Sequence, residues 1–212
     1  KFANKNLLDE GVHKKKIFFV GNIMIDTLMA YSNQLSEPKI WSKFDLKKKN
    51  YLLLTLHRPS NVDKQIYLEK ILSKISKSLL LDKIIFPVHP RTKKIIKKIN
   101  NFPKNIILID PLPYLEFSYL LKHSLCTITD SGGITEEATV YKVPCLTMRN
   151  STERPETILT GSNELVGKNI DKISDHLSKI KKNKWKKSRV PTKWDGKTSH
   201  RILHILMKEM NI

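Results

Sequence analysis

The chain has 212 residues, with 39 Lys or Arg residues against 20 Asp or Glu residues, so its formal net charge is +19. This length suits one large domain, and no apolar run is long enough to predict a membrane-spanning helix. The only two cysteines, Cys126 and Cys145, lie in apolar runs, which argues for free buried thiols and a reducing, cytoplasmic environment rather than a disulfide scaffold.

Strand-like and helix-like stretches alternate along the chain, which indicates a doubly wound parallel α/β sheet with helices on both faces. Strands are predicted at Ile17–Val20, Tyr51–Leu56, Ile84–Val88, Ile106–Ile109, Leu125–Thr129 and Pro144–Met148, with a short seventh at Glu164–Val166. Helices are predicted at Ile23–Leu35, Lys64–Leu81, Thr92–Ile99, Leu115–Lys122, Gly133–Tyr141, Glu153–Leu159, Ile170–Lys182 and Lys197–Met210. Ligands of such sheets bind beyond the carboxyl ends of the strands.

The basic charge fits three kinds of partner: a nucleic acid, an anionic membrane surface or a phosphorylated ligand. We favour a general bias in residue usage, because Lys, Asn and Ile are abundant throughout the chain. The run Lys179–Arg189 is basic, but no recognised nucleic-acid module accompanies it. Neither a nucleic acid nor a membrane is therefore expected as a partner.

The segment Thr129–Ala138 reads Thr-Asp-Ser-Gly-Gly-Ile-Thr-Glu-Glu-Ala and carries the most informative local pattern. Gly132 and Gly133 have no Cβ, so a phosphate can approach the backbone closely. The helix that starts there offers free N–H groups and the positive end of its dipole. Glu137 lies four residues after Gly133 on the same helix face, where a carboxylate suits a ribose diol. A tight turn with solvated acids is the alternative.

A second segment with anion-binding character follows the next predicted strand, where Met148–Glu156 reads Met-Arg-Asn-Ser-Thr-Glu-Arg-Pro-Glu. Ser151 or Thr152 is expected to cap the following helix, with Pro155 in its first turn. Arg154 then lies at a second helix N-terminus, where its guanidinium needs an anion or a carboxylate as partner. The two helix starts together predict a diphosphate site.

Two further motifs follow strands: Thr-Leu-His-Arg-Pro-Ser-Asn-Val-Asp at 55–63 and Pro-Val-His-Pro-Arg-Thr at 87–92. With the two segments above, in this order, they closely resemble the non-hydrolysing UDP-N-acetylglucosamine 2-epimerases. Val20–Leu28 and Trp194–Leu206 are similar to two more family segments, so the resemblance runs from about Asn6 to the end of the chain.

The resemblance implies the C-terminal, Rossmann-like domain of a two-domain enzyme of GT-B type. A start at Lys-Phe-Ala-Asn, without Met or a signal-peptide pattern, also indicates a fragment. Residues 1–16 are expected to be a linker remnant of a missing N-terminal domain, and residues 17–190 the nucleotide-binding domain. Residues 191–212 are expected to form a helix that packs toward the missing domain, and the full-length enzyme to be a homodimer.

The resemblance also assigns roles to individual residues. It places His57 near the reacting sugar and diphosphate, where a histidine can stabilise charge or move a proton. It places His89 against the nucleotide and Phe117 beside the uracil, and makes Arg58 a candidate UDP contact. The remaining implied contacts are Ser131, Gly132, Gly133 and Arg154 for the diphosphate and Glu137 for the ribose.

Several of these residues have a second interpretation. His57 could be a loop histidine held by a carbonyl, Arg58 a structural ion-pair partner, and Phe117 a core residue. His200 and His204 have the i, i+4 spacing of metal ligands, but no third ligand is evident, so surface histidines are expected.

The family interconverts UDP-N-acetylglucosamine and UDP-N-acetylmannosamine. A base removes the C2 proton as UDP leaves, and UDP adds back after C2 is reprotonated on the other face. The resemblance implies neither a redox cofactor nor a metal. Because the family's acid/base carboxylates lie in its N-terminal domain, this chain alone is expected to bind UDP and UDP-N-acetylglucosamine without turnover.

Other functions share part of this pattern. A glycosyltransferase of GT-B type would hold a nucleotide diphosphate at the same edge, but His57-Arg58 followed by Asn61-Val62-Asp63 favours the epimerase. A hydrolysing 2-epimerase is disfavoured by the Glu-Arg-Pro-Glu segment. A basic binding module would differ from all of these in a steep loss of binding with salt.

Overall fold

The fold is built on a six-stranded sheet in the order β3-β2-β1-β4-β5-β6, in a computed structural model that describes residues 2–78, 83–167 and 169–210. All of the paired strands are parallel. This is the strand order of a doubly wound nucleotide-binding fold, so the predicted fold class is confirmed. The strands are β1 Leu52–Thr55, β2 Ile84–Pro87, β3 Ile106–Ile109, β4 Cys126–Thr129, β5 Cys145–Thr147 and β6 Asn163–Leu165.

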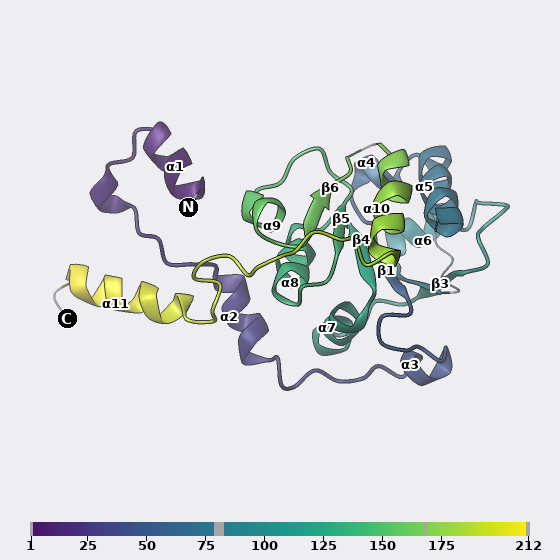
Figure 1. The fold of residues 1–212 in the computed structure, drawn as a ribbon, viewed down its shortest axis with the longest axis horizontal. Coiled ribbons are helices and arrows are strands. Elements are labelled where there is room, and N and C mark those ends of the chain that lie inside the picture. The colour runs from purple at the N-terminus through teal and green to yellow at the C-terminus, as the bar shows by residue number, and fades with distance from the viewer. Residues whose placement is uncertain (1, 79–82, 168, 211–212) are drawn as a thin grey trace.

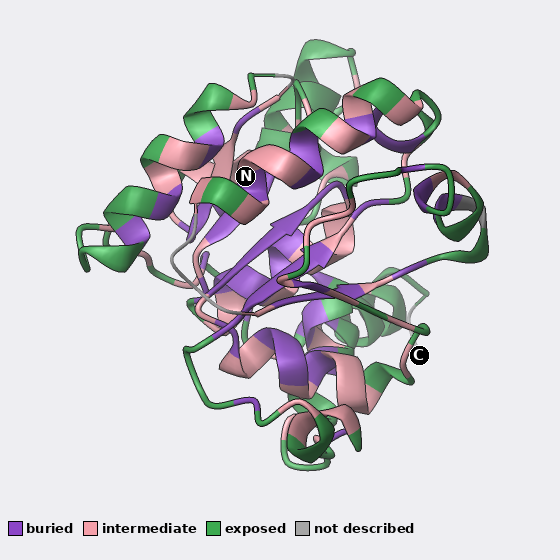
Figure 2. Ribbon diagram, turned by 90° about the vertical axis from the view of Figure 1, so that its right-hand side faces the viewer, coloured by how far each residue is buried: buried purple, intermediate pink, exposed green. Residues whose placement is uncertain are grey.

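Helices cover both faces of the sheet (Figures 1 and 2). Alternate strand residues point to opposite faces, so Leu52 and Leu54 belong to one core cluster and Leu53 to the other. The helices that supply the first cluster are α4 Pro59–Val62, α5 Gln65–Ser78, α6 Pro90–Ile96 and α10 Asp171–Lys181. Those of the second are α7 Tyr114–His123 and α8 Gly132–Val140, with α3 Ile40–Lys43 packed beside it.

The register between β1 and β4 positions the site. Thr55 pairs with Thr129 at the last position of both strands, and their hydroxyl oxygens lie 2.6 Å apart. The residues that follow the two strands, at 56–58 and 130–133, therefore emerge side by side. The strand order reverses direction between β1 and β4, and in this fold class ligands bind at that point.

Both ends of the chain lie to one side of the sheet (Figure 1). α1 Phe2–Asp9 and a 3₁₀ turn at Lys14–Lys16 precede α2 Ile23–Ala30, and α11 Thr198–Met210 ends the described chain. The Asp26 carboxylate accepts hydrogen bonds from the first N–H groups of α11, at Thr198 (3.0 Å) and Ser199 (2.6 Å). A small cluster of Ile25, Leu28 and Trp194 packs behind this contact.

One predicted strand is wrong. Residues Ile17–Val20 lie outside the sheet, although they form an apolar run. Their carbonyl groups are bonded by side chains from the end of the chain instead: Lys193 Nζ donates to Phe19 O (2.6 Å) and Arg201 Nη1 to Val20 O (3.0 Å). An apolar run therefore marked a half-buried to exposed segment here, without a strand partner.

The other predicted elements are confirmed, most of them with shifted ends, and the short seventh strand is β6. The helix predicted at Ile23–Leu35 ends at Ala30. The helix predicted at Lys64–Leu81 is α5, and the final part of that range, from 79, lies outside the described residues. α1, α3, α4 and the 3₁₀ turn were not predicted. α9 Pro155–Leu159 completes the set.

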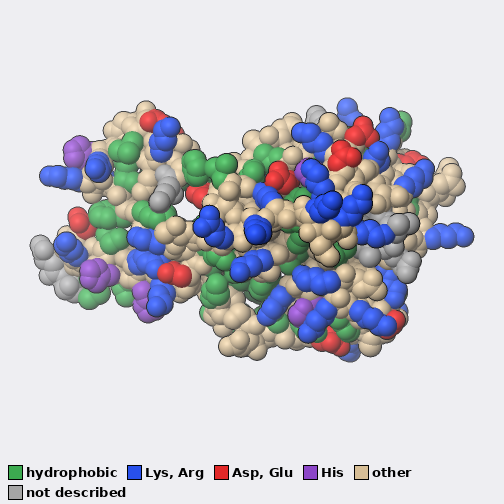
Figure 3. Space-filling view, viewed as in Figure 1, with side chains coloured by type: hydrophobic (Ala, Val, Ile, Leu, Met, Phe, Trp, Pro, Cys, Tyr) green, Lys and Arg blue, Asp and Glu red, His purple; other side chains and the backbone are tan. Residues whose placement is uncertain are grey.

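Basic side chains spread over the whole face seen in Figure 3 and do not gather into one patch. On this face, the distribution agrees with a general bias toward Lys. No helix in the described ranges is long and apolar enough to cross a membrane. Both cysteines are buried and free, as predicted.

Candidate functional site

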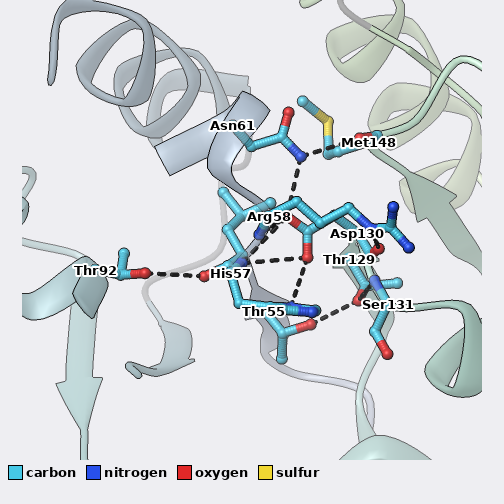
Figure 4. Close-up of polar contacts among 10 residues, drawn as sticks. Thr55, His57, Arg58, Asn61, Thr92, Thr129, Asp130, Ser131 and Met148 are labelled. Carbon is cyan, nitrogen blue, oxygen red and sulfur yellow. Dashed lines mark hydrogen bonds and ion pairs between the residues drawn. The ribbon is translucent and has the colours of Figure 1, made fainter. Parts of the chain in front are cut away.

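A buried carboxylate lies where β1 and β4 end (Figure 4). Asp130, directly after β4, is 0% exposed. Its Oδ2 accepts hydrogen bonds from the backbone N–H of Arg58 (2.9 Å) and from Asn61 Nδ2 (3.0 Å). Asn61 also donates to Met148 O (3.1 Å), just beyond β5. Asp130 thus joins the ends of β1 and β5 to α4, and we call Asp130, His57, Arg58 and Asn61 the Asp130 hub.

His57 belongs to this hub through its ring as well as its backbone. The ring Nδ1 lies 2.8 Å from Asp130 Oδ1, and the histidine side chain is 53% exposed. Its partner is therefore a carboxylate, not the carbonyl of the structural alternative. Arg58 Nε donates to the backbone carbonyl of Asp130 (2.9 Å). The prediction that His57 and Arg58 lie at the carboxyl edge of the sheet holds, and their proposed roles toward a ligand stay predictions.

The first turn of α8, at the Ser-Gly-Gly segment, is only partly covered by the rest of the described protein. α8 begins at Gly132, after Ser131 in an extended conformation. A Cβ placed on Gly133 would meet no heavy atom within 4 Å, and one on Gly132 would lie 3.7 Å from Arg149 Nη1. The protein itself does not crowd these glycines. They leave room above the first N–H groups of the helix, which is where an anion would approach.

Two ion pairs border the start of α8, and we call their four residues the charged rim. Arg149 binds Glu153 through both guanidinium branches, at 2.8 Å and 2.5 Å. Arg154 Nε pairs with Glu136 Oε1. The hydrogen bonds from Arg149 are the largest cause that lowers the pKa of Glu153 to about 2. Arg149 was not selected from the sequence, although its place immediately after an apolar strand was the available signal.

The predicted cap of α9 is wrong. Arg154 itself is the N-cap residue, with Pro155 at the first helical position. Thr152 Oγ1 instead accepts a hydrogen bond from the backbone N–H of Arg154 (3.1 Å), two residues away. This local turn is an alternative to helix capping for a short hydroxyl side chain. It leaves the Arg154 side chain at the rim, next to a cavity of about 520 Å³ lined by Glu153, Arg154 and residues 18–23.

Glu137, on α8, lies beside Tyr114 of α7, and Phe117 belongs to α7 itself. Burial raises the pKa of Glu137 to about 7, the charge of Glu136 adds to this, and a hydrogen bond with Tyr114 opposes it. Glu137 can thus exist in a neutral form near neutral pH. Phe117 is half-buried and packs against the second core cluster. Both the core role of Phe117 and a ligand contact through its open side are compatible with this placement.

His89 follows β2 at the same edge of the sheet and is exposed, immediately before α6. His200 and His204 lie on α11, at the side of the molecule that holds the chain ends. They line a cavity with Phe19 and Lys193. Over the ranges that the structure describes, no three His, Cys, Asp or Glu side chains form a metal-binding group.

Comparison with known proteins decides the family. Residues 1–207 match the family described as UDP-N-acetylglucosamine 2-epimerase. The chain belongs to this family. The UDP-N-acetylglucosamine 2-epimerase of Methanocaldococcus jannaschii is 42% identical over 216 residues, which cover 96% of this chain and 58% of the relative.

Solved epimerase structures share the fold. The Methanocaldococcus jannaschii enzyme, solved in complex with UDP-GlcNAc and UDP, has a TM-score of 0.81 at 39% identity and covers 97% of this chain and 59% of its own. Staphylococcus aureus MnaA, solved with UDP, has a TM-score of 0.84 at 27% identity and covers 99% and 59%. The chain thus spans a little under three fifths of the length of the family members that it matches.

Sequence reasoning missed the centre of this candidate site. It selected His57 and Arg58, but not Asp130 or Asn61, which hold them. Both were visible as polar residues inside family motifs. Asp130 directly follows β4, whose four residues are all buried, and a carboxylate at that position marks the buried end of a strand.

Proposed function

We propose that this chain is the UDP-binding, C-terminal part of a non-hydrolysing epimerase of GT-B type, which interconverts UDP-N-acetylglucosamine and UDP-N-acetylmannosamine. The observation that carries the proposal is the open start of α8 between the Asp130 hub and the charged rim. It combines a helix N-terminus, three arginines and a histidine at the edge where this fold binds nucleotides. The family match supports UDP-sugars as the ligands.

The reaction makes a clear physical demand on this part of the enzyme. UDP leaves the sugar with growing negative charge on its diphosphate, and must be held until it adds back. Preorganised donors stabilise such charge without rearrangement at the moment of reaction. We assign this role to Ser131, Gly132 and Gly133 through the start of α8, and to Arg154 and His57 beside it. Further UDP contacts are proposed for Arg58, His89, Phe117 and, at the ribose, Glu137.

The chemistry at C2 needs a second part of the protein. Elimination requires a base that is positioned on the sugar, and we propose that carboxylates of a preceding N-terminal domain supply it. Exposed apolar side chains support a docking role for the side of the molecule that holds the chain ends. They are Phe2, Leu7 and Leu8 of α1, Ile23, Met24 and Met29 of α2, and Leu203, Leu206, Met207 and Met210 of α11.

The proposal also covers the domains of the chain, its oligomeric state and its location in the cell. Residues 1–16 would connect to the N-terminal domain, residues 17–190 bind the nucleotide and residues 191–212 pack back toward that domain. We propose a homodimer for the full-length enzyme, which sedimentation of that form tests. The cytoplasm is the proposed location, and the two free cysteines support it.

Hydrogen exchange at C2 of UDP-N-acetylglucosamine tests the proposal. In D2O, NMR should detect deuterium at C2 with a form of the protein that includes the N-terminal domain, and none with the 212-residue chain. His57→Ala in the longer form should slow the exchange strongly. Exchange by the 212-residue chain would show that the base has been misplaced.

Calorimetry measures which nucleotide the chain binds, independently of whether it catalyses a reaction. The 212-residue chain should bind UDP weakly, because one wall of the cleft belongs to the other domain. UMP should bind less tightly than UDP, since it lacks the second phosphate. Tighter binding of NADH than of UDP would contradict the proposed site.

A further inference from the structure

Three N–H donors and the ring of His57 surround the Asp130 carboxylate. Oδ1 lies 2.8 Å from His57 Nδ1 and 3.2 Å from the backbone N of His57. Oδ2 accepts from the backbone N–H groups of His57 (3.1 Å) and Arg58 (2.9 Å) and from Asn61 Nδ2 (3.0 Å). Backbone N–H groups can only donate, so neither oxygen is free to carry a proton toward them.

The orientation of the Asn61 amide is fixed independently. Its Nδ2 also lies 3.1 Å from Met148 O, a carbonyl that can only accept. The NH2 group, and not the amide oxygen, must therefore face both Met148 and Asp130. Oδ2 then accepts hydrogen bonds from three donors. Oδ1 faces the backbone N–H and the ring of His57, so the imidazole is the last of the described groups that contact the carboxylate.

We propose that Asp130 is a positioning residue that holds His57 with its proton on Nδ1, so that Nε2 faces the cleft. A ring nitrogen 2.8 Å from an ionised carboxylate carries a proton. A neutral imidazole has only one, so Nε2 keeps its lone pair. Nε2 lies on the ring edge opposite the buried Asp130, and the histidine side chain is 53% exposed.

This inference rests on the proposed function, and it specifies how His57 acts in it. Nε2 can take up a proton from water, and the resulting imidazolium is balanced by Asp130 on one side. On the other side, its Nε2–H becomes a donor for a diphosphate oxygen. A carboxylate that fixes the tautomer and stabilises the imidazolium is a general device for directing one ring nitrogen at a reacting group.

Nitrogen NMR of the nucleotide-free 212-residue chain, labelled in its histidine rings, tests the tautomer directly. A His57→Gln variant identifies the His57 signals among the seven histidines. At a pH where the ring is neutral, the parent should show a protonated Nδ1 and an unprotonated Nε2, which resonate far apart. If the His57 ring of the parent carried its proton on Nε2, this result alone would overturn the proposal.

Asp130→Asn should reverse the tautomer. The backbone N–H groups of His57 and Arg58 and the Asn61 amide hold an oxygen in the Oδ2 position. The new NH2 group then occupies the Oδ1 position and donates toward His57 Nδ1. Nδ1 must accept, and the proton moves to Nε2. Retention of the Nδ1–H form in a folded Asp130→Asn variant would overturn the proposal.

Asn61→Ala is the matched control. It removes a donor from the same carboxylate but leaves Asp130 facing Nδ1, so the parent tautomer should persist. A reversed tautomer in Asn61→Ala would show that loosening of the hub is enough, and would also overturn the proposal. UDP is then added to the same samples as a separate measurement. A failure to bind UDP would contradict the proposed function. The tautomer measured without nucleotide would still decide the inference about Asp130.

Discussion

The Asp130 hub and the charged rim lie at the same edge of the sheet, and each uses carboxylates to hold donors. In the hub, the carboxylate is 0% exposed and half of its donors are backbone N–H groups, which cannot turn away. In the rim, the Glu153 side chain is 61% exposed and that of Arg154 46%. Water can solvate Glu153 and Arg154 when a pair opens, but it cannot reach the Asp130 carboxylate.

The difference separates framework from binding surface. A buried charge that loses a partner keeps its desolvation cost, whereas an exposed pair exchanges partners at little cost. Asp130 should therefore behave as part of the fold, and the rim arginines should exchange their carboxylates for phosphate. Each rim pair has one nearly buried member, Arg149 in one and Glu136 in the other, while the partners Glu153 and Arg154 are exposed to water.

Asp130→Ala should have the largest effect, on stability. It leaves buried donors from His57, Arg58 and Asn61 without an acceptor, which should lower the free energy of unfolding by about 3–5 kcal/mol. Urea denaturation measures this. Asp110→Ala, which removes an exposed carboxylate paired with Lys93, should cost less than about 1 kcal/mol. Equal losses in the two variants would remove the distinction between framework and surface.

Arg154→Ala should lower UDP affinity by about 1.5–3 kcal/mol, the range for a charge-assisted hydrogen bond. Lys should restore only part of it, because it lacks the planar fork. Calorimetry measures the loss. Since Arg154→Ala also leaves Glu136 buried without its cation, the double variant Arg154→Ala/Glu136→Gln is the control. It should recover stability without recovering affinity, and unchanged UDP binding would make Arg154 a structural ion-pair partner.

Glu137→Gln should change how stability depends on pH. Burial raises the pKa of Glu137 from 4.5 to about 7, so between these values the folded state binds more protons than the unfolded state. Stability of the parent should therefore fall as the pH rises through this window. Gln stays neutral and should gain about 1–2 kcal/mol over the parent at about pH 8 and nothing at about pH 4. Parallel pH profiles would contradict a neutral Glu137.

Glu153→Gln should have the smallest effect. Its carboxylate competes with a diphosphate for Arg149, and because Glu153 is 61% exposed, water limits what the pair contributes to about 1 kcal/mol. UDP affinity should rise by no more than that amount, measured by calorimetry beside the parent. Weaker binding in Glu153→Gln would mean that the carboxylate holds Arg149 in place for the ligand, and that the pair belongs with the framework.

Much of this arrangement could be predicted from the sequence. Strand alternation and one fold rule bring His57, His89, Gly133 and Arg154 to a single edge of the sheet, because each of them follows a strand. The Ile17–Val20 strand was wrong because an apolar run does not reveal whether its backbone has a strand partner. Its carbonyl groups are bonded by side chains from the far end of the chain, which no local pattern reveals.

The role of Asp130 was hidden for a related reason. Its donors come from residues about 70 positions earlier in the chain, and they converge only through the register of β1 with β4. α4 was missed because Pro-Ser-Asn reads as a turn, yet this short helix is what carries Asn61 into the hub. Pair geometry of this kind is decided by tertiary structure and not by residue type.

The cap that Asp26 forms on α11 has a consequence for the order of folding. Its bonds to Thr198 and Ser199 span 172 and 173 positions, and the bond from Arg201 to Val20 spans 181. During synthesis the six strands can pair before α11 has left the ribosome, whereas residues 17–30 must wait for it. Contacts this distant in sequence are slow to close. The corner that joins the two ends should therefore be the last to gain protection from hydrogen exchange on refolding.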